Sequence, residues 1–222
     1  MKRAADATLL IAPGCPHCPQ VLAALSELVK EGLIGRLEVI NIAAHPEAAR
    51  AAGTRSVPWM RIGPYELTGL HSPSELRRWA ERARKGAGIG PWYREALEEG
   101  RLEEALSRIR RHPEELKALL EMLQGHPPIA VRVGISALVE ELAGTDALRA
   151  LIPRLGELTR DPEPATRADA AHYLGLTGDP SAAPLLRALL KDEAEQVREI
   201  AREALEALEH PGRWGDQKRE GA

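Results

Sequence analysis

Phenylalanine is absent from the 222 residues of this chain, and other aromatic side chains are few, with four Trp and three Tyr. Hydrophobic residues still make up 44% of the sequence and charged residues 28%, a balance typical of folded domains. The hydrophobic cores must therefore be aliphatic. Because one domain typically takes about 100–150 residues, this length is comfortable for two domains.

Only two cysteines are present, Cys15 and Cys18, too few for a small secreted domain held together by disulfides. No apolar run approaches the ~18 residues of a membrane span. The first apolar stretch covers only Thr8 to Ala12, whereas a signal peptide needs about 7–15 apolar residues. We therefore expect a cytoplasmic protein without a membrane partner. In a reducing cytosol, a lone cysteine pair is more often catalytic or metal-binding than structural.

The net charge is −3 at pH 7, which argues against a nucleic-acid partner. Residues 1–86 hold twelve Lys and Arg against eight Asp and Glu, whereas residues 87–222 hold eighteen against twenty-five. This change of sign coincides with a Gly-rich linker, Lys85 to Pro91. We therefore place a domain boundary at residue 86.

The first domain alternates between strand and helix patterns. Short apolar or alternating runs predict strands, and longer runs with helical spacing and Gly or Ser boundaries predict helices. The expected strands cover 7–12, 37–42, 57–62 and 65–68, and the expected helices cover 18–31, 46–52 and 72–84. This order fits an α/β domain with a small central sheet and helices on both faces.

The second half is entirely helical in pattern and contains an internal repeat. Val131-Arg132, Thr166-Arg167 and Val197-Arg198 align, with spacings of 35 and 31 residues, and similar apolar residues follow each pair. A period of this length carrying two helices predicts a stacked solenoid. The pattern resembles HEAT-like repeats over 126–208. We expect a linker and capping helices over 87–125 and a flexible tail over 209–222.

Both cysteines belong to one motif, Cys15-Pro16-His17-Cys18, between an expected strand and an expected helix. Cys15 would lie just before the helix, where free backbone N–H groups and the helix dipole stabilise a thiolate. Cys18 would lie one turn further on and be more buried. Pro16 and His17 would tune the thiolate, since Pro16 removes an N–H donor and His17 adds a hydrogen bond or positive charge.

The segments Gly14-Cys-Pro-His-Cys-Pro19 and Ser56-Val-Pro-Trp59 resemble the thioredoxin/glutaredoxin superfamily, and most of all the glutaredoxin-like protein disulfide oxidoreductases of prokaryotes. The likeness spans residues 5–84. It implies a thioredoxin fold and a cis bond between Val57 and Pro58, with the proline facing the cysteine pair.

The same resemblance implies a substrate groove. The backbone of Val57, beside Pro58, would pair with an extended substrate. Gly69 and Leu70, in the loop before the last helix of the domain, would lie at the groove rim. Between Ala7 and Ser26 there is no Asp, Glu, Lys or Arg. We therefore expect a largely apolar surface around the motif, suited to a polypeptide.

The sequence departs from the superfamily pattern at two positions. Thioredoxins carry a buried acid six residues before the nucleophile, where this chain has Leu9, and an aromatic residue just before it, where this chain has Gly14. The usual buried acid is therefore not available to take the proton of the resolving thiol. His17 or solvent water would serve that step.

We expect an enzyme, a thiol–disulfide oxidoreductase that uses Cys15 and Cys18 and needs no cofactor beyond their redox-active disulfide. Its partners would be a disulfide- or dithiol-bearing protein client and an upstream reductase or oxidant, with the HEAT-like domain binding the client or a partner. A redox-switched interaction scaffold is one alternative. Transfer of Cu(I) or Zn is another, although zinc usually takes four ligands and the histidines show no ligand spacing, so we expect no resident metal.

Overall fold

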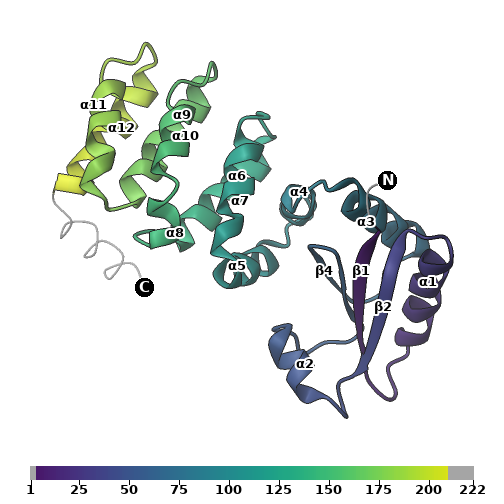
Figure 1. Ribbon diagram of the computed structural model, residues 1–222. Coiled ribbons are helices and arrows are strands. Elements are labelled where there is room, and N and C mark those ends of the chain that lie inside the picture. The colour runs from purple at the N-terminus through teal and green to yellow at the C-terminus, as the bar shows by residue number, and fades with distance from the viewer. Residues whose placement is uncertain (1–3, 210–222) are drawn as a thin grey trace. The chain divides into compact units, whose positions relative to one another are not determined.

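The computed structural model describes residues 4–209, and the chain divides into two compact units, Met1–Pro91 and Trp92–Ala222 (Figure 1). The boundary expected at residue 86 falls five residues before the division between the units. Apart from Glu209, the tail expected over 209–222 lies outside the described residues.

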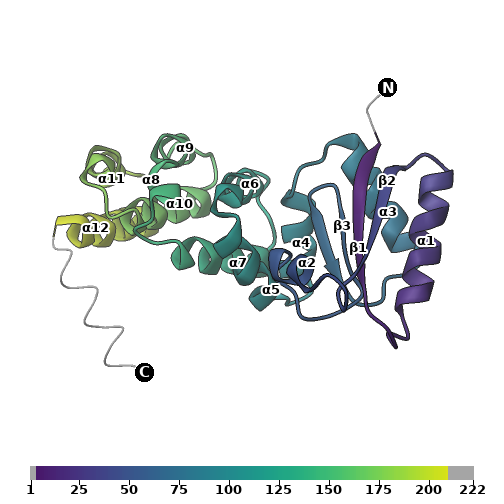
Figure 2. The same cartoon turned by 60° about the horizontal axis from the view of Figure 1, so that its bottom comes forward.

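The first unit is built on a four-stranded mixed sheet with the strand order β2-β1-β3-β4. Its elements are β1 (Ala5–Ile11), α1 (Cys18–Lys30), β2 (Ile34–Asn41), α2 (Pro46–Ala51), β3 (Trp59–Ile62), β4 (Tyr65–Thr68) and α3 (Pro73–Lys85). The strand β1 runs parallel to β2 and antiparallel to β3. In Figure 2, α1 and α3 cover one face of the sheet and α2 lies on the other.

Helices cover both faces of the central strand β1. Leu9 and Leu10 are adjacent, so their side chains point to opposite faces, and both are buried. In α1, the buried residues Val21, Leu25 and Leu28 follow helical spacing. The aliphatic core predicted from the composition is therefore present, and helical and extended patterns match the expected order of elements.

Two buried aromatic side chains of this core lie together. The rings of Tyr65 and Trp79 are both buried, with centroids 4.6 Å apart. The hydroxyl of Tyr65 donates a 2.7 Å hydrogen bond to the carbonyl of Gly88. This bond ties the segment that follows α3 back to the sheet.

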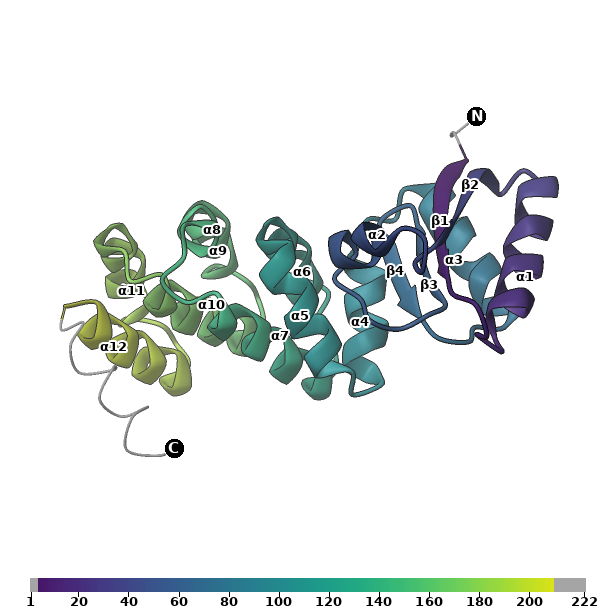
Figure 3. The same cartoon turned by 90° about the horizontal axis from the view of Figure 1, so that it is seen from below.

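The described part of the second unit is helical. Its elements are α4 (Gly90–Glu98), α5 (Leu102–Arg111), η1 (Pro113–Glu115), α6 (Leu116–Leu123), α7 (Ile129–Glu141), α8 (Asp146–Arg149), α9 (Ile152–Leu158), α10 (Pro164–Leu176), η2 (Pro180–Ala182), α11 (Ala183–Leu189) and α12 (Glu195–Glu209). Figure 3 shows α7, α10 and α12 in one row and α6, α9 and α11 in another, as expected for stacked helix pairs.

The recurring arginines hold successive repeats together. Arg167 Nη1 donates to the carbonyls of Asp161 and Pro162, which precede its own helix, and Arg198 binds the equivalent carbonyls of residues 192 and 193. Arg167 also reaches Asp192, in the loop before α12. These arginines are therefore structural parts of the repeat.

The linker predicted from Lys85 to Pro91 is shorter in the structure. The helix α3 ends with the left-handed Gly86, which has φ +70°, and α4 already begins at Gly90. Pro91 stands in the first turn of α4, where the missing N–H of proline costs no hydrogen bond. In the chain from residue 4 to 209, no helix combines the length and apolar character needed to cross a membrane.

Candidate active site

A disulfide joins Cys15 and Cys18 where the chain passes from β1 into α1. The S–S distance is 2.10 Å and the two Cα atoms are 5.5 Å apart. Among residues 4–209 there is no free cysteine. The structure therefore brings the two predicted catalytic residues into one bonded pair.

The turn before the helix fixes the position of this pair. Gly14 adopts a left-handed backbone conformation, with φ +77°, that residues other than glycine rarely adopt. The N–H of Cys15 then donates to the carbonyl of Ala12 at 3.3 Å. The glycine that replaces the expected aromatic residue therefore supplies the tight turn that leads into the motif.

The two sulfur-bearing residues lie in different environments. Cys18 is the first residue of α1 and only 5% exposed, whereas Cys15 is half-buried. The backbone N–H of Cys18 donates to Cys15 Sγ at 3.2 Å. A negative charge on the Cys15 sulfur would receive this hydrogen bond at the positive end of a helix, so the arrangement favours thiolate at Cys15.

The two residues between the cysteines are exposed. His17 is the N-cap residue of α1, but its side chain makes no capping hydrogen bond. Within the described chain, the His17 ring has no hydrogen-bond or ion-pair partner. Its imidazole is open to solvent, and so is Pro16, so the tuning roles assigned to both residues stay predictions.

The register of the sheet brings the predicted groove residues to the end of the sheet that carries the disulfide. Leu10 near the end of β1 lies opposite Trp59 at the start of β3, and Trp59 lies opposite Thr68 at the end of β4. Val57 and Pro58 precede β3, and Gly69 and Leu70 follow β4. These four residues therefore gather where β1 leads into the cysteine motif.

Hydrogen bonding and backbone geometry fix this end of the sheet. The Val57–Pro58 bond is cis, as the resemblance implies. The N–H of Gly69 donates to the carbonyl of Pro58 at 2.8 Å. Pro58 is buried, Val57 and Gly69 are half-buried, and Leu70 is 48% exposed. The structure thus leaves an apolar side chain, Leu70, open to solvent at this edge.

The position of the usual buried acid holds Leu9, which is fully buried. A leucine offers no group that could accept a proton from Cys18. Deprotonation of Cys18 therefore depends on groups outside this position, as the sequence indicates.

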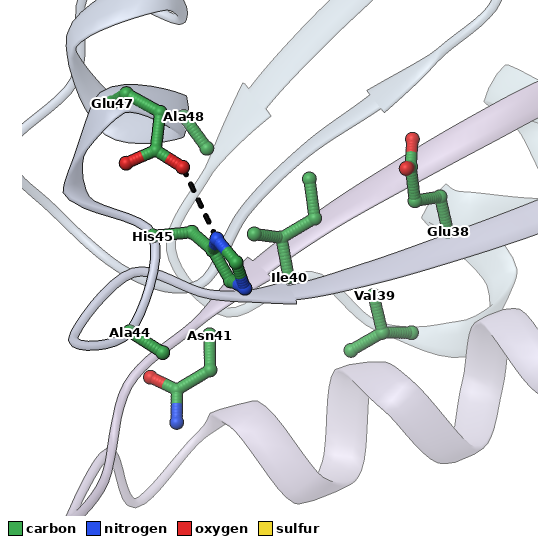
Figure 4. Close-up of a pocket in the computed structure, with 8 residues that line it drawn as sticks. All are labelled: Glu38, Val39, Ile40, Asn41, Ala44, His45, Glu47 and Ala48. Carbon is green, nitrogen blue, oxygen red and sulfur yellow. Dashed lines mark hydrogen bonds and ion pairs between the residues drawn. The ribbon is translucent and has the colours of Figure 1, made fainter.

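The structure also contains two hollows that none of the predicted site residues line. One, of about 510 Å³, lies along the edge strand β2 and the start of α2 (Figure 4). Its lining is Glu38, Val39, Ile40, Asn41, Ala44, His45, Glu47 and Ala48, and His45 Nδ1 lies 3.1 Å from Glu47 Oε1. The other, of about 550 Å³, lies between α1 and α3. The sequence pattern gave no signal for either.

The described residues form no cluster of potential metal ligands. No group of three or more His, Cys, Asp and Glu side chains with metal-binding geometry occurs between residues 4 and 209. Since zinc usually takes four protein ligands in a structural site, the described residues offer no such centre.

Comparison with known families agrees with this geometry. The family model for the thioredoxin domain matches residues 7–81, and the model for HEAT repeats matches residues 116–206. The repeat match begins at α6, ten residues before the start expected from sequence. No curated protein matches the chain. The chain therefore joins a thioredoxin-like domain that carries a close cysteine pair, the basis of a thiol redox role, to a set of HEAT repeats.

Proposed function

We propose that the protein is a thiol–disulfide oxidoreductase that acts on protein substrates through Cys15 and Cys18. One observation carries this proposal: the N–H of buried Cys18 donates to the sulfur of the more exposed Cys15. That asymmetry gives the two sulfurs the different tasks that disulfide exchange requires. Cys15 is the nucleophile and Cys18 the resolving residue.

The reaction begins with both cysteines reduced. The Cys15 thiolate attacks one sulfur of the substrate disulfide, forms a mixed disulfide and expels the other substrate sulfur as a thiolate, which takes up a proton. Cys18 loses its proton and attacks Cys15 Sγ, releasing the second substrate thiol. The substrate gains two electrons, and the enzyme keeps a Cys15–Cys18 disulfide.

The reverse sequence oxidises a dithiol client. In either direction an upstream reductase or oxidant must restore the starting state of the cysteine pair. The cysteine pair itself carries the two electrons in its dithiol form and gives them up when it becomes a disulfide, so the cycle needs no other cofactor. Two cysteines in 222 residues fit a reducing compartment such as the cytoplasm.

The substrate class follows from the surroundings of the pair. No Asp, Glu, Lys or Arg occurs from Ala7 to Ser26, and Leu70 is exposed at the same end of the sheet. An extended polypeptide would pair with the backbone of Val57, beside Pro58, by strand addition. The HEAT repeats supply a second surface for selecting or holding this client, since stacked repeats create extended binding faces.

The test is a mixed-disulfide trap in the full-length protein. The Cys18→Ser variant should retain clients covalently through Cys15, because the resolving step is blocked. The matched Cys15→Ser variant should retain none. Non-reducing electrophoresis followed by mass spectrometry would identify the adducts. Equal recovery from both variants, or none from Cys18→Ser, contradicts the mechanism.

Turnover separates this function from a redox-switched scaffold. The wild-type protein should catalyse many rounds of reduction of a disulfide-bonded protein by dithiothreitol, and the Cys15→Ser variant should not. A protein that changes redox state once, without turnover, would instead be a switch.

A further inference from the structure

Two apolar side chains on α7 are exposed to an unusual degree. Within residues 4–209 only four large hydrophobic side chains are exposed: Val39, Leu70, Ile129 and Val133. Ile129 is 75% exposed and Val133 62% exposed, the two highest values of the four. Leaving side chains of this size in water forgoes the stabilisation that burial of apolar surface provides.

These two residues form one stripe along α7. They are four positions apart, so they share a helix face, and Glu140, seven residues after Val133, lies on the same face. The opposite side of α7 holds buried residues, including Val131 and Ile135, that face the repeat core. The exposed pair is therefore not a part of the repeat packing.

Acidic residues predominate among the exposed charges on and beside this stripe. Glu140, whose Oε1 lies 3.3 Å from His172 Nε2, and Glu141 are exposed on α7 itself. Glu163, in the loop before α10, is also exposed and has no ion-pair partner within the described chain. This loop lies beside the start of α7, because His126 Nε2 is 3.0 Å from Asp161 Oδ1.

Two cations of the same region are engaged in ion pairs, whereas Arg160, in the loop before α10, is exposed. Arg132 forms an ion pair with Asp169 of α10, and Arg110 forms one with Glu141. Over residues 92–209 the chain holds fifteen Lys and Arg against twenty-three Asp and Glu. The stripe therefore combines two open apolar side chains with a surplus of negative charge.

We propose that the Ile129–Val133 face of α7 binds a client segment in which apolar side chains are flanked by Lys or Arg. The apolar side chains cover the exposed pair, and the basic residues lie against Glu140 and Glu163. This inference rests on the proposed function, because it names the chemistry of the polypeptide that the HEAT repeats hold for the cysteine pair.

A second copy of this chain is a poorer occupant. Pairing the stripe with itself would bring one acidic surface against another, and like charges across an interface oppose association. A basic segment avoids that repulsion and is attracted by the acidic surface. Complementary charge also predicts binding that weakens as the salt concentration rises.

Binding is tested with synthetic cysteine-free peptides and the full-length protein, by isothermal titration calorimetry. One peptide carries a Leu pair flanked by Lys, and the matched peptide carries the same Leu pair flanked by Glu. The Ile129→Ser/Val133→Ser variant, which removes the apolar pair without changing the charge, should bind the Lys-flanked peptide about tenfold more weakly, a change of about 1.4 kcal/mol. The Glu-flanked peptide should bind weakly to every protein.

The control variant is Val39→Ser/Ala188→Ser, which introduces the same two serines at exposed positions outside α7. It should bind the Lys-flanked peptide as the wild type does. Equal affinity for the two peptides, or no loss in the Ile129→Ser/Val133→Ser variant, overturns the inference. A dimer in sedimentation that this variant alone abolishes overturns it too, since a second copy would then be the occupant.

A separate measurement isolates the proposed function. Reduction of a small aromatic disulfide such as dithiobis-nitrobenzoate depends on Cys15 and Cys18 but needs no client surface. The wild type and both serine variants should turn it over at the same rate. No turnover by the wild type refutes the oxidoreductase, whereas the peptide titration reports on α7 in either case.

Discussion

Arg167 and Asp192 meet through two parallel hydrogen bonds, from Nε and Nη2 of the guanidinium to the two carboxylate oxygens, each 2.8 Å long. Both side chains are only 8% exposed. Glu193 also binds Arg167, but its side chain is 84% exposed. Arg167 therefore forms two ion pairs, a buried one between repeats with Asp192 and a solvent-exposed one with Glu193.

Replacing Asp192 should therefore destabilise the repeats strongly. We expect Asp192→Asn to lower the free energy of unfolding by about 3 kcal/mol, because it leaves a buried guanidinium without its charge partner. The matched variant Glu193→Gln should cost no more than about 1 kcal/mol. Urea denaturation followed by circular dichroism measures both, and equal losses would contradict the distinction.

The same pair predicts a pH dependence. The hydrogen bonds from Arg167 hold the pKa of Asp192 below its ordinary value of 3.8. A carboxyl whose pKa is lower in the folded than in the unfolded state stabilises the fold above about pH 4 and loses that contribution as pH falls through the folded pKa. The stability gap between wild type and Asp192→Asn should thus be constant near neutral pH and shrink in acid.

Gly175 allows α10 and α12 to pack close together. A Cβ added at Gly175 would lie 2.8 Å from Ala204 Cβ and 3.1 Å from its Cα, which is too close. We expect Gly175→Ala to destabilise the protein by about 1–3 kcal/mol, despite the higher helix propensity of alanine. In the control Gly134→Ala, the three atoms nearest the added Cβ all belong to the flexible Leu97 side chain, so thermal unfolding should change less.

Alkylation of the reduced protein should distinguish the two cysteines. Cys15 is half-buried and receives the Cys18 N–H, whereas Cys18 is buried at the start of α1. We expect iodoacetamide to modify Cys15 first and Cys18 slowly, because access and thiolate character both favour Cys15. Peptide mass spectrometry over a time course reads the order. Equal rates would remove the asymmetry on which the proposed mechanism depends.

The exposed Leu70 should matter only for large substrates. We expect Leu70→Asp to raise KM for a disulfide-bonded protein about tenfold, by removing an apolar contact and adding a charge at the groove rim. Reduction of a small aromatic disulfide should stay within about twofold of the wild type. A parallel loss on both substrates would indicate damage to the cysteine pair instead.

Much of the first unit could be predicted from sequence because its local signals agree. Alternating or apolar runs between Gly and Pro predicted the strands. The cysteine motif marked the end of β1, and Val57-Pro58 marked the region where β3 begins. The hollow along β2 gave no such signal, because it depends on how the loop before α2 packs. The exposure of Ile129 and Val133 could not be predicted from the sequence either, because apolar residues at helical spacing are typical of a buried core.

Arg132 shows where a sequence repeat misleads. Its alignment with Arg167 and Arg198 predicts the same contacts, but it pairs with Asp169 instead. The residue six positions before it, His126, has φ +46°, so the preceding loop follows a different backbone path from the loops before α10 and α12. His126, rather than an arginine, then binds Asp161. Residue type repeats here, but backbone conformation does not.

The short connection between the units sets the local concentration of a client. Only residues 86–89 separate α3 from α4. A segment joined to a neighbouring module by a short tether is held at an effective concentration in the millimolar range. A client held on the repeats, as proposed above, would therefore meet the cysteine pair as an intramolecular reactant. Weak contacts with each unit would then be sufficient for exchange, and would also let the product leave.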